Sequence, residues 1–331
     1  MPPLADANYQ AQFAQRWGHL RQPHVRDLAW LLDAPGLLDA AHPQWQGKIA
    51  APDPVSAAVG AWLARLDHDP AELEAALGAR PTIRLGLYAE KLMAFYYQQH
   101  GRLVAHGLQV RATRNDTVGE FDFLLDAGPD GLEHIEFATK FYLLEGEAAS
   151  RFDTFVGPNL ADSLGAKMRK IFDKQLALGT HPAAQALLPR PVIRARALVK
   201  GWLFYPLGSN AAMSGISAPH CRGFWCALSD IPSLEAQRYV VLPRLQWLAP
   251  YQAQAPQALL DRAQLHAMLA AQFETVPMPV LVAAVVEREN EGEHGEDEQE
   301  NRQVLETARG FIVPDNWRAR AAFRQQIAAA R

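Results

Sequence analysis

The segment from Gly119 to Leu144 has the pattern of a β-hairpin with acidic side chains on one face. Its first arm, residues 120–125, alternates acidic and apolar residues with the period of two that is typical of a strand. Its second arm, residues 134–144, follows the same period less regularly. Residues 126–131, between the arms, are rich in Asp, Gly and Pro, which favour a turn. The sequence therefore predicts an antiparallel pair of strands, around which the rest of the chain must be arranged.

The two arms place several charged side chains on common faces, because residues two apart on a strand point the same way. Glu120 and Asp122 share a face of the first arm, and His134, Glu136 and Lys140 share a face of the second. With the turn centred near residue 129, Asp122 lies opposite Glu136, with Cβ atoms roughly 5 Å apart. Facing carboxylates repel each other, whereas a divalent cation between them makes the arrangement favourable. The pattern therefore indicates a metal site at Asp122 and Glu136.

These residues resemble the PD-(D/E)XK nuclease superfamily, which has the restriction-endonuclease-like fold. The resemblance rests on residues 119–124, followed by a strand that ends in an acid and, four residues later, Lys140. Three stretches are more closely similar to a bacterial family, domain of unknown function 1853, which is usually grouped with that superfamily. They are residues 85–91, residues 136–143, and residues 157–162 with Lys174, Gln175 and Leu176 behind them. The similarity covers the chain from about residue 80 to Pro314.

The chain departs from the superfamily pattern at one position. The pattern has an acid two residues before the lysine, and here that position is Ala138. The nearest acid on the same face is Glu136, about 13 Å from Lys140 along a regular strand. The reach of the lysine side chain, or a bulge at Ala138 and Thr139, would close part of that gap. Without either, we expect a degenerate site.

The resemblance also implies a role for Glu90, which lies in a predicted helix over residues 82–100. In the superfamily, a glutamate of the first core helix often reaches the metal site. The alternative is an ion pair of Glu90 with Lys91 or Arg84. Both interpretations stay open at the level of sequence.

The order of predicted elements agrees with the resemblance. A helix over residues 82–100, three strands, a helix that begins at Gly157–Asn159 and runs to Leu178, and a strand over Arg194–Pro206 follow one another. This is the αβββαβ order of the nuclease core. We therefore predict an α/β (α+β) fold with a restriction-endonuclease-like core over residues 81–206, in which helices flank a mixed central sheet.

Both flanks of this core have their own patterns. Residues 1–80 predict a cap of short helices. Residues 207–331 predict an α+β extension that contains an acidic loop, residues 287–301. The extension's predicted strands cover residues 223–228, 239–248, 280–286 and 310–313, and its predicted helices cover residues 257–273 and 315–330.

Lys167, Lys170 and Lys174 form a basic stripe on the helix predicted after Gly157. Beside an acidic metal site, such a row favours contacts with nucleic-acid phosphates. A solvated helix face is the alternative interpretation.

Composition narrows the class of protein. The chain has 331 residues, a net charge of −4 and two cysteines, Cys221 and Cys226. The charge argues against a generally basic nucleic-acid coat protein but permits a local basic groove. Two cysteines predict ordinary reduced thiols. The N-terminus lacks a signal-peptide pattern, and no apolar run reaches about 18 residues, so we predict a cytoplasmic location.

Three functions fit these patterns. The first is a nuclease-like hydrolase of phosphodiester bonds, in which Asp122 and Glu136 hold Mg²⁺ or Mn²⁺, Lys140 orients a water or stabilises charge, and Glu90 completes the metal shell. It predicts weak Mn²⁺-dependent cleavage that Lys140→Ala abolishes. The second is a catalytically inactive module that binds nucleic acid or a protein partner. The third is a set of structural ion pairs, for example Glu136 with Lys140 or Arg111. The choice between DNA and RNA, and the oligomeric state, stay open.

Overall fold

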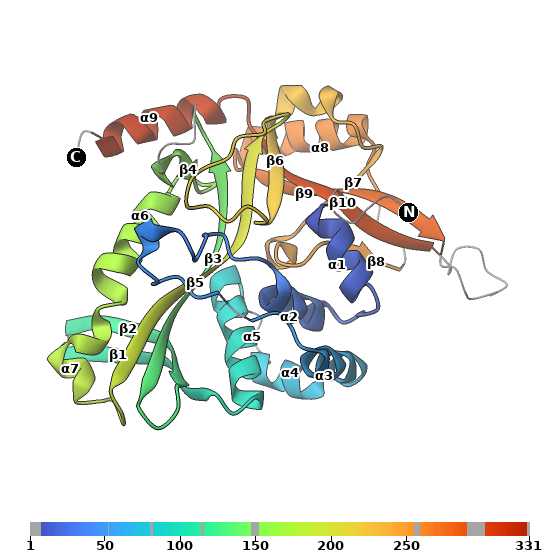
Figure 1. Ribbon diagram of the computed structural model, residues 1–331. Helices are drawn as coiled ribbons and strands as arrows, with labels where there is room; N and C mark the ends of the chain where they lie inside the picture. The colour runs from blue at the N-terminus through green and yellow to red at the C-terminus, as the bar shows by residue number, and fades with distance from the viewer. Residues whose placement is uncertain are drawn as a thin grey trace.

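The computed structural model describes residues 8–51, 53–79, 82–113, 116–146, 152–254, 259–289 and 302–329. Its centre is a 10-stranded mixed sheet that crosses the whole molecule (Figure 1). The strands are β1 (Leu103–Thr113), β2 (Asp116–Asp126), β3 (Leu132–Leu144), β4 (Phe155–Val156), β5 (Val192–Pro206), β6 (Arg222–Ala227), β7 (Arg238–Val241), β8 (Gln252–Ala253), β9 (Val280–Glu289) and β10 (Arg302–Val313). The main path runs β1-β2-β3-β5-β6-β10-β9-β7, with β4 paired to β3 and β8 paired to β10.

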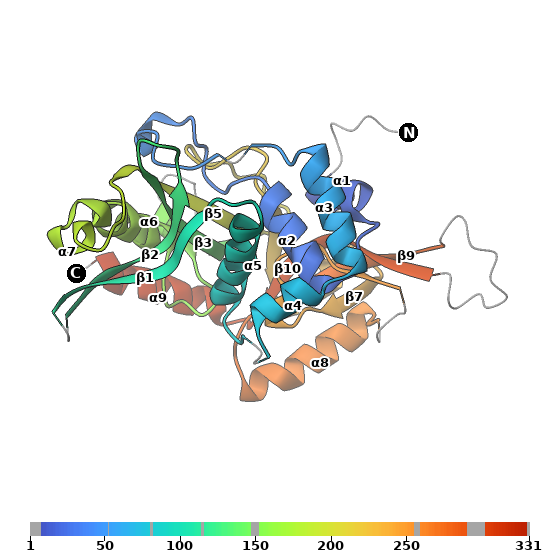
Figure 2. The ribbon, with the colours of Figure 1, turned by 90° about the horizontal axis from the view of Figure 1, so that it is seen from below.

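Helices cover this sheet on both faces. They are α1 (Tyr9–Trp17), α2 (Pro23–Asp33), α3 (Ala57–His68), α4 (Ala71–Leu77), α5 (Leu85–Gln99), α6 (Leu164–Lys170), α7 (Pro182–Gln185), α8 (Arg262–Thr275) and α9 (Trp317–Ala329). Helices α2 to α5 lie beside one another, as Figure 2 shows from below. The predicted N-terminal stretch of short helices is therefore present, and it packs on the first core helix, α5.

The hairpin predicted at the centre of the sequence is formed by β2 and β3. They pair antiparallel from Asp126↔Leu132 to Phe123↔Ile135. On its other edge β3 runs parallel to β5, from Leu132↔Val192 to Leu143↔Phe204. The order α5, β1, β2, β3, α6, β5 confirms the predicted succession of a helix, three strands, a helix and a strand.

Alternation along β5 shows how the sheet separates two apolar cores. Leu198, Trp202 and Phe204 pack in the core that includes α1, α2, α3 and α5. Val199 and Leu203 pack in the core that includes α6 and residues of the 37–49 segment. Because side chains alternate between faces, the same period assigns odd-numbered residues of β3 to the α5 face and even-numbered ones to the α6 face.

The strands after residue 207 continue the same sheet. β6 pairs parallel with both β5 and β10, and β10 pairs antiparallel with β9. The strand predicted over residues 280–286 and its predicted partner at residues 310–313 are thus confirmed. Helix α8 packs beside β7, and its Leu265 and Leu269 join an apolar core that includes Val282 and Ala284 of β9. The predicted core and C-terminal extension therefore share one sheet.

Helix α6 begins later than the sequence predicted. Residues 157–162 form a turn in which the Gly157 N–H donates to the Asp162 carbonyl, and Leu160 has a positive φ of 58°. The Ser163 hydroxyl then accepts a hydrogen bond from the Ala166 N–H and caps the helix. The expected helix start at Gly157–Asn159 is therefore wrong, because a stronger side-chain cap lies six residues further on.

The extension differs from its prediction in three places. The strand expected over residues 239–248 ends at Val241, where Pro243 leads into a 3-10 turn over Arg244–Gln246. The helix expected from residue 257 begins at Arg262, after a capping box formed by Asp261 and Gln264. Residues 287–289 of the predicted acidic loop belong to β9, and residues 290–301 lie outside the described residues.

No helix in the described ranges is long and apolar enough to cross a membrane. Cys221 and Cys226 are both buried free thiols, as predicted.

Candidate active site

Asp122 and Glu136 lie where the pairing of β2 with β3 ends. The last pair is Phe123↔Ile135, and Asp122 and Glu136 are the next residue on each strand, just beyond the paired segment. There a side chain replaces the backbone acceptor, because Asp122 Oδ2 accepts a hydrogen bond of 2.8 Å from the Phe137 N–H. The two acidic side chains are thus held next to each other at a point where the strands separate.

Glu136 is almost completely buried, with 1% exposure. Its Oε1 accepts a hydrogen bond from the Gln175 side-chain amide and lies 3.6 Å from the Lys167 ammonium. Among the described residues no donor reaches its Oε2, which lies 4.0 Å from His134 Nε2. When Glu136 is protonated, its carboxyl group hydrogen-bonds the neighbouring Asp122 carboxylate. A buried carboxylate oxygen without a donor is costly unless a further group satisfies it.

Lys167 and Gln175 reach Glu136 from α6 and the turn that follows it. In a regular α-helix, a residue eight positions on is rotated by roughly 80° around the axis. Here residues Ile171–Gln175 form a π-helical turn, in which the Leu176 N–H donates to the Ile171 carbonyl. The wider turn brings Gln175 back toward Lys167, and the Lys167 ammonium lies 3.5 Å from the Gln175 side-chain oxygen.

Burial and mutual repulsion set the protonation of the acidic groups. Burial, and then the neighbouring Asp122 carboxylate, raise the pKa of Glu136 to about 8, while Lys167 opposes the shift. Burial also raises the pKa of Asp122, against the lowering effect of the Phe137 N–H. Burial, together with Asp122 and Glu120, raises the pKa of Glu90 to about 7. Three carboxyl groups are therefore close enough to resist full ionisation together.

His134 lies beside this group in an apolar setting. It is fully buried, and its ring meets Phe121 edge to face at a centroid distance of 4.8 Å. Burial lowers the pKa of His134 to about 4, so the imidazole is neutral at pH 7. Among the described residues neither ring nitrogen has a hydrogen-bond partner.

Lys140 occupies a different position from the one that the sequence pattern suggested. Its ammonium lies 3.4 Å from the Asp162 carboxylate, which also accepts a hydrogen bond from the Tyr142 hydroxyl. Strand β3 stays in register with β5 through Ala138 and Thr139, so the bulge considered from the sequence is not formed there. The distance of about 13 Å between the Cα atoms of Glu136 and Lys140 therefore stands.

Glu90 approaches from α5. The ion pair considered with Lys91 or Arg84 does not form, because Lys91 donates to the Leu77 carbonyl and the described residues place no cation within 4.0 Å of Glu90. Arg111, the other partner considered for Glu136, instead donates to the Gln109 side chain.

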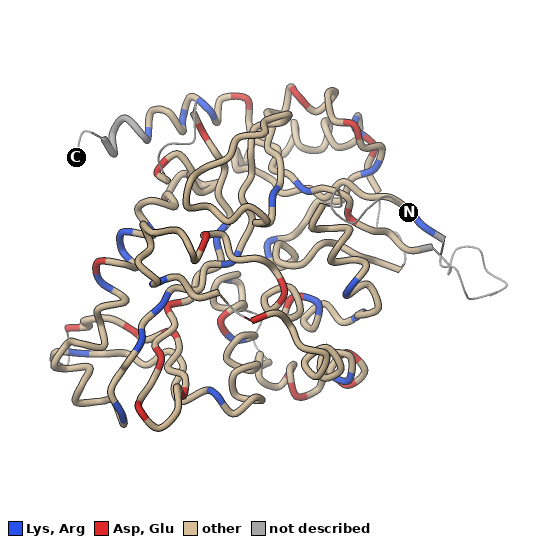
Figure 3. Tube along the Cα trace, in the orientation of Figure 1, with Lys and Arg blue, Asp and Glu red and all other residues tan. Residues whose placement is uncertain are grey.

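The three lysines of the predicted basic stripe have different environments. Lys167 is largely buried beside Glu136, with 18% of its side chain exposed, whereas Lys170 and Lys174 are exposed. The pKa of Lys140 is lowered by burial first, and Lys167 and Lys170 lower it further. Cations therefore gather at the rim of the acidic pair, although basic and acidic positions are interspersed along the whole trace (Figure 3).

The structure brings Glu136 and Glu90 each near Asp122, but not as a complete protein cage. Across the ranges described above, no group of three or more His, Cys, Asp or Glu side chains is placed to hold a metal ion. Two carboxylates are nevertheless a sufficient protein contribution for Mg²⁺, which usually keeps several waters and takes its remaining ligands from substrate phosphates. The unpartnered Glu136 Oε2 fits such an ion.

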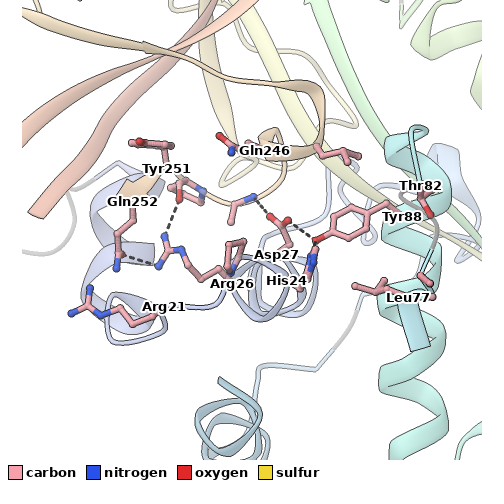
Figure 4. Close-up of a pocket in the computed structure, with 16 residues that line it drawn as sticks. Arg21, His24, Arg26, Asp27, Leu77, Thr82, Tyr88, Gln246, Tyr251 and Gln252 are labelled. Carbon is pink, nitrogen blue, oxygen red and sulfur yellow. Dashed lines mark hydrogen bonds between the residues drawn. The ribbon is translucent and has the colours of Figure 1, made fainter. Parts of the chain in front are cut away.

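A separate cavity of about 490 Å³ lies between α2, α5 and the segment before β8 (Figure 4). The Tyr88 hydroxyl donates to Asp27 Oδ2 at 2.8 Å and lies 2.8 Å from His24 Nδ1, while the Ala249 N–H donates to Asp27 Oδ1. Burial raises the pKa of Asp27 to about 6. Both oxygens of Asp27 are used, so this network joins α2 to α5 and to the loop before β8.

Neither the curated proteins nor the solved structures contain a match. A family model described as "Domain of unknown function (DUF1853)" matches residues 26–313. That range includes all but the first three residues of α2, all ten strands and α6, and it covers more than half of the chain. The chain therefore belongs to this family.

Proposed function

We propose that the protein is a Mg²⁺- or Mn²⁺-dependent phosphodiester hydrolase that acts on nucleic acid. The observation that carries the proposal is the pair of adjacent carboxylates, Asp122 and Glu136, with a buried unpartnered oxygen on Glu136 and the Lys167 ammonium 3.6 Å from its other oxygen. Carboxylate oxygens suit hard divalent cations. In the absence of metal, a proton shared between Glu136 and Asp122 relieves their repulsion, and a divalent cation would replace that proton.

The arrangement of the core supports this proposal. The order α5, β1, β2, β3, α6, β5, with β1, β2 and β3 antiparallel and β5 parallel to β3, matches the αβββαβ order of the restriction-endonuclease-like core. Asp122 and Glu136 lie on the two strands that carry the acidic motif residues of the PD-(D/E)XK pattern. This agreement is one of topology, and the chemistry depends on the side chains.

The placement of Lys167 suggests how the chain supplies the cation of the PD-(D/E)XK pattern although Ala138 departs from that pattern. With Glu136 as the acid of the motif, the lysine position two residues later is Ala138, which packs against Leu164 and Met168 of α6. Lys167, from the same helix, places its ammonium beside Glu136 instead. A cation from α6 thus takes the place of one from β3.

Each residue then has a defined task. Asp122 and Glu136 would hold the metal, which supplies polarisation of a phosphate oxygen and a lower pKa for a bound water. Lys167 would stabilise the charge that develops on the phosphoryl group. Lys140 and Lys170, near Lys167, would hold neighbouring phosphates. Glu90 would accept a hydrogen bond from a metal-bound or attacking water.

The direct test is cleavage of end-labelled DNA and RNA, each single- and double-stranded, with Mn²⁺ or Mg²⁺. We expect metal-dependent cleavage of at least one substrate by the wild-type protein and none by Asp122→Ala, because that variant loses half of the carboxylate pair. Asp126→Asn, which changes an exposed carboxylate at the tip of the same hairpin, is the matched control. Equal cleavage by the wild-type protein and Asp122→Ala would identify a contaminating nuclease and refute the proposal.

A second function, a binding module without catalysis, is favoured by two features. Ala138 stands where the pattern has its second acid, and the ammonium of Lys140 is paired with Asp162. This module would bind nucleic acid through the same lysines. Binding without metal-dependent cleavage of any of the four substrates would select it.

Both functions predict that Lys170 and Lys174 contact phosphates. Changing both to Gln is expected to reduce the slope of log K against log salt by up to about 1.8 on duplex DNA, at roughly 0.9 for each phosphate contact. The measurement is fluorescence anisotropy across a salt series, with Arg65→Gln and Arg238→Gln as a control pair of exposed cations elsewhere. An unchanged slope in the lysine variant would assign these lysines to solvation alone.

A further inference from the structure

A second charged cavity, of about 430 Å³, lies on the opposite face of the sheet. Its centre is Glu133 of β3, which is buried with 2% exposure. As an odd-numbered residue of β3, Glu133 points to the α5 face, whereas Glu136 points to the α6 face. The cavity is therefore separate from the candidate active site.

Three guanidinium groups converge on the single carboxylate of Glu133. Arg194 Nε lies 3.1 Å from Glu133 Oε1, Arg196 Nη2 lies 2.6 Å from the same oxygen, and Arg102 Nη2 lies 3.9 Å from Oε2. They come from two places, since Arg194 and Arg196 belong to β5 and Arg102 follows α5. Each guanidinium offers five N–H donors, so one carboxylate satisfies only a minority of them.

The cavity consequently has an excess of positive charge. Among the described residues, Glu133 is the one carboxylate within 4.0 Å of these three guanidinium groups. Asp53 also lines the cavity but lies beyond that distance. The three arginines and the two acidic residues together give the lining a net charge of +1. Half of the Arg102 and Arg194 side chains is exposed, at 50% and 53%, and both side chains line the cavity. Convergent guanidinium groups are the usual protein partners of phosphate.

The rest of the lining is apolar and aromatic. Tyr96 and Tyr97 of α5 contribute rings, and the Arg102 guanidinium lies 5.9 Å from the centre of the Tyr97 ring. Aliphatic side chains complete this wall, namely Leu31, Leu32, Met93, Ile135 and Leu198. A cavity of this volume is within the range of small-ligand sites. Inorganic phosphate would leave the apolar wall uncovered, whereas a planar base would cover it.

We propose that this cavity binds a nucleoside phosphate, with the phosphate on Arg102, Arg194 and Arg196 and the base against Tyr96 and the leucines. The same chemistry occurs in a free nucleotide and in the phosphorylated end of a nucleic-acid strand. The site stands independently of the proposed hydrolase activity, since it uses none of the same side chains.

The test is isothermal titration of the full-length protein with AMP, adenosine, inorganic phosphate and a 5′-phosphorylated trinucleotide. We expect AMP to bind at least tenfold more tightly than adenosine or phosphate. Arg102→Gln should weaken AMP binding at least tenfold, and it leaves the Arg194 and Arg196 ion pairs of Glu133 in place, so folding is retained. Arg111→Gln, an exposed arginine of β1, is the matched control. Binding of the trinucleotide as tightly as AMP would identify a strand end, and weaker binding would identify a free nucleotide.

Three outcomes would overturn the inference. They are the absence of binding by both AMP and the trinucleotide, equal affinities for AMP and inorganic phosphate, and unchanged AMP affinity in Arg102→Gln with a native thermal transition. Asp122→Ala should bind AMP as the wild-type protein does. That comparison separates a failure of this site from a failure of the proposed active site.

Discussion

Replacing Lys167 by Ala is expected to reduce Mn²⁺-dependent cleavage about 100- to 1,000-fold, the usual loss when one charge-stabilising donor is removed from an active site. The reason is its position, since Lys167 brings its ammonium 3.6 Å from Glu136. The measurement is single-turnover cleavage of the best substrate found for the wild-type protein. Metal binding should persist, because Asp122 and Glu136 are unchanged.

Lys140→Ala is the matched comparison, since it removes a lysine that is also near the site. Its ammonium is paired with Asp162, so we expect a smaller loss than for Lys167→Ala, mainly through weaker substrate binding. A larger loss for Lys140→Ala would assign the catalytic cation to β3, as the sequence pattern suggested. Equal full activity in both variants would remove lysine from the mechanism.

Glu136→Gln is expected to make the metal-free protein more stable at pH 8. In the folded protein the pKa of Glu136 is about 8, against a usual value of 4.5. Between these values the folded state holds a proton that the unfolded state releases, so the free energy of unfolding of the wild-type protein falls as pH rises from about 4.5 to about 8. Gln carries no titrating proton. At about 1.4 kcal/mol per pKa unit, the gain at pH 8 is on the order of a few kcal/mol and disappears near pH 4.

The measurement is urea unfolding in EDTA between pH 5 and pH 8, where both proteins fold. Glu120→Gln, on the same hairpin but exposed, is the control and should keep the wild-type dependence on pH. If Glu136→Gln lost stability with pH as steeply as the wild-type protein, Glu136 would already be ionised at neutral pH, and the account of a strained acidic pair would be wrong.

The sequence predicted the hairpin and the order of the core elements well, for a local reason. Period-two alternation and a cluster of turn residues specify strands directly, and the resulting register pairs Phe123 with Ile135, one residue before Asp122 and Glu136. The αβββαβ order follows from similar local patterns. Nothing beyond neighbouring residues was needed for these predictions.

The partners of Glu136 depended on information that the sequence pattern hides. A π-helical turn at Ile171–Gln175 changes the helical period, so Lys167 and Gln175 do not share a face in a regular helical projection. The sequence did hold a signal for the true start of α6, namely Ser163, because Ser is a preferred N-cap residue. The sequence placed Lys167 on a basic stripe but missed its contact with Glu136.

The Glu133 cavity was also missed, because it unites residues from segments that are far apart in the sequence, from Leu31 of α2 to Leu198 of β5. Arg194 and Arg196 meet Glu133 only because β5 runs parallel to β3 in this register. Parallel pairing between distant strands has no local sequence signal comparable to a hairpin turn.

The central claim is that Asp122 and Glu136 bind a divalent cation, and thermal unfolding with Mn²⁺ tests it most directly. In the wild-type protein, Mn²⁺ at one hundred times its dissociation constant should add about 2.7 kcal/mol to the free energy of unfolding. The effect should be larger at pH 8 than at pH 6, since the metal competes with the proton on Glu136. Asp122→Asn should abolish it, whereas Asp126→Asn should retain it. A wild-type protein whose melting temperature does not change with up to 10 mM Mn²⁺, or an Asp122→Asn variant that responds as the wild-type protein does, would contradict the account.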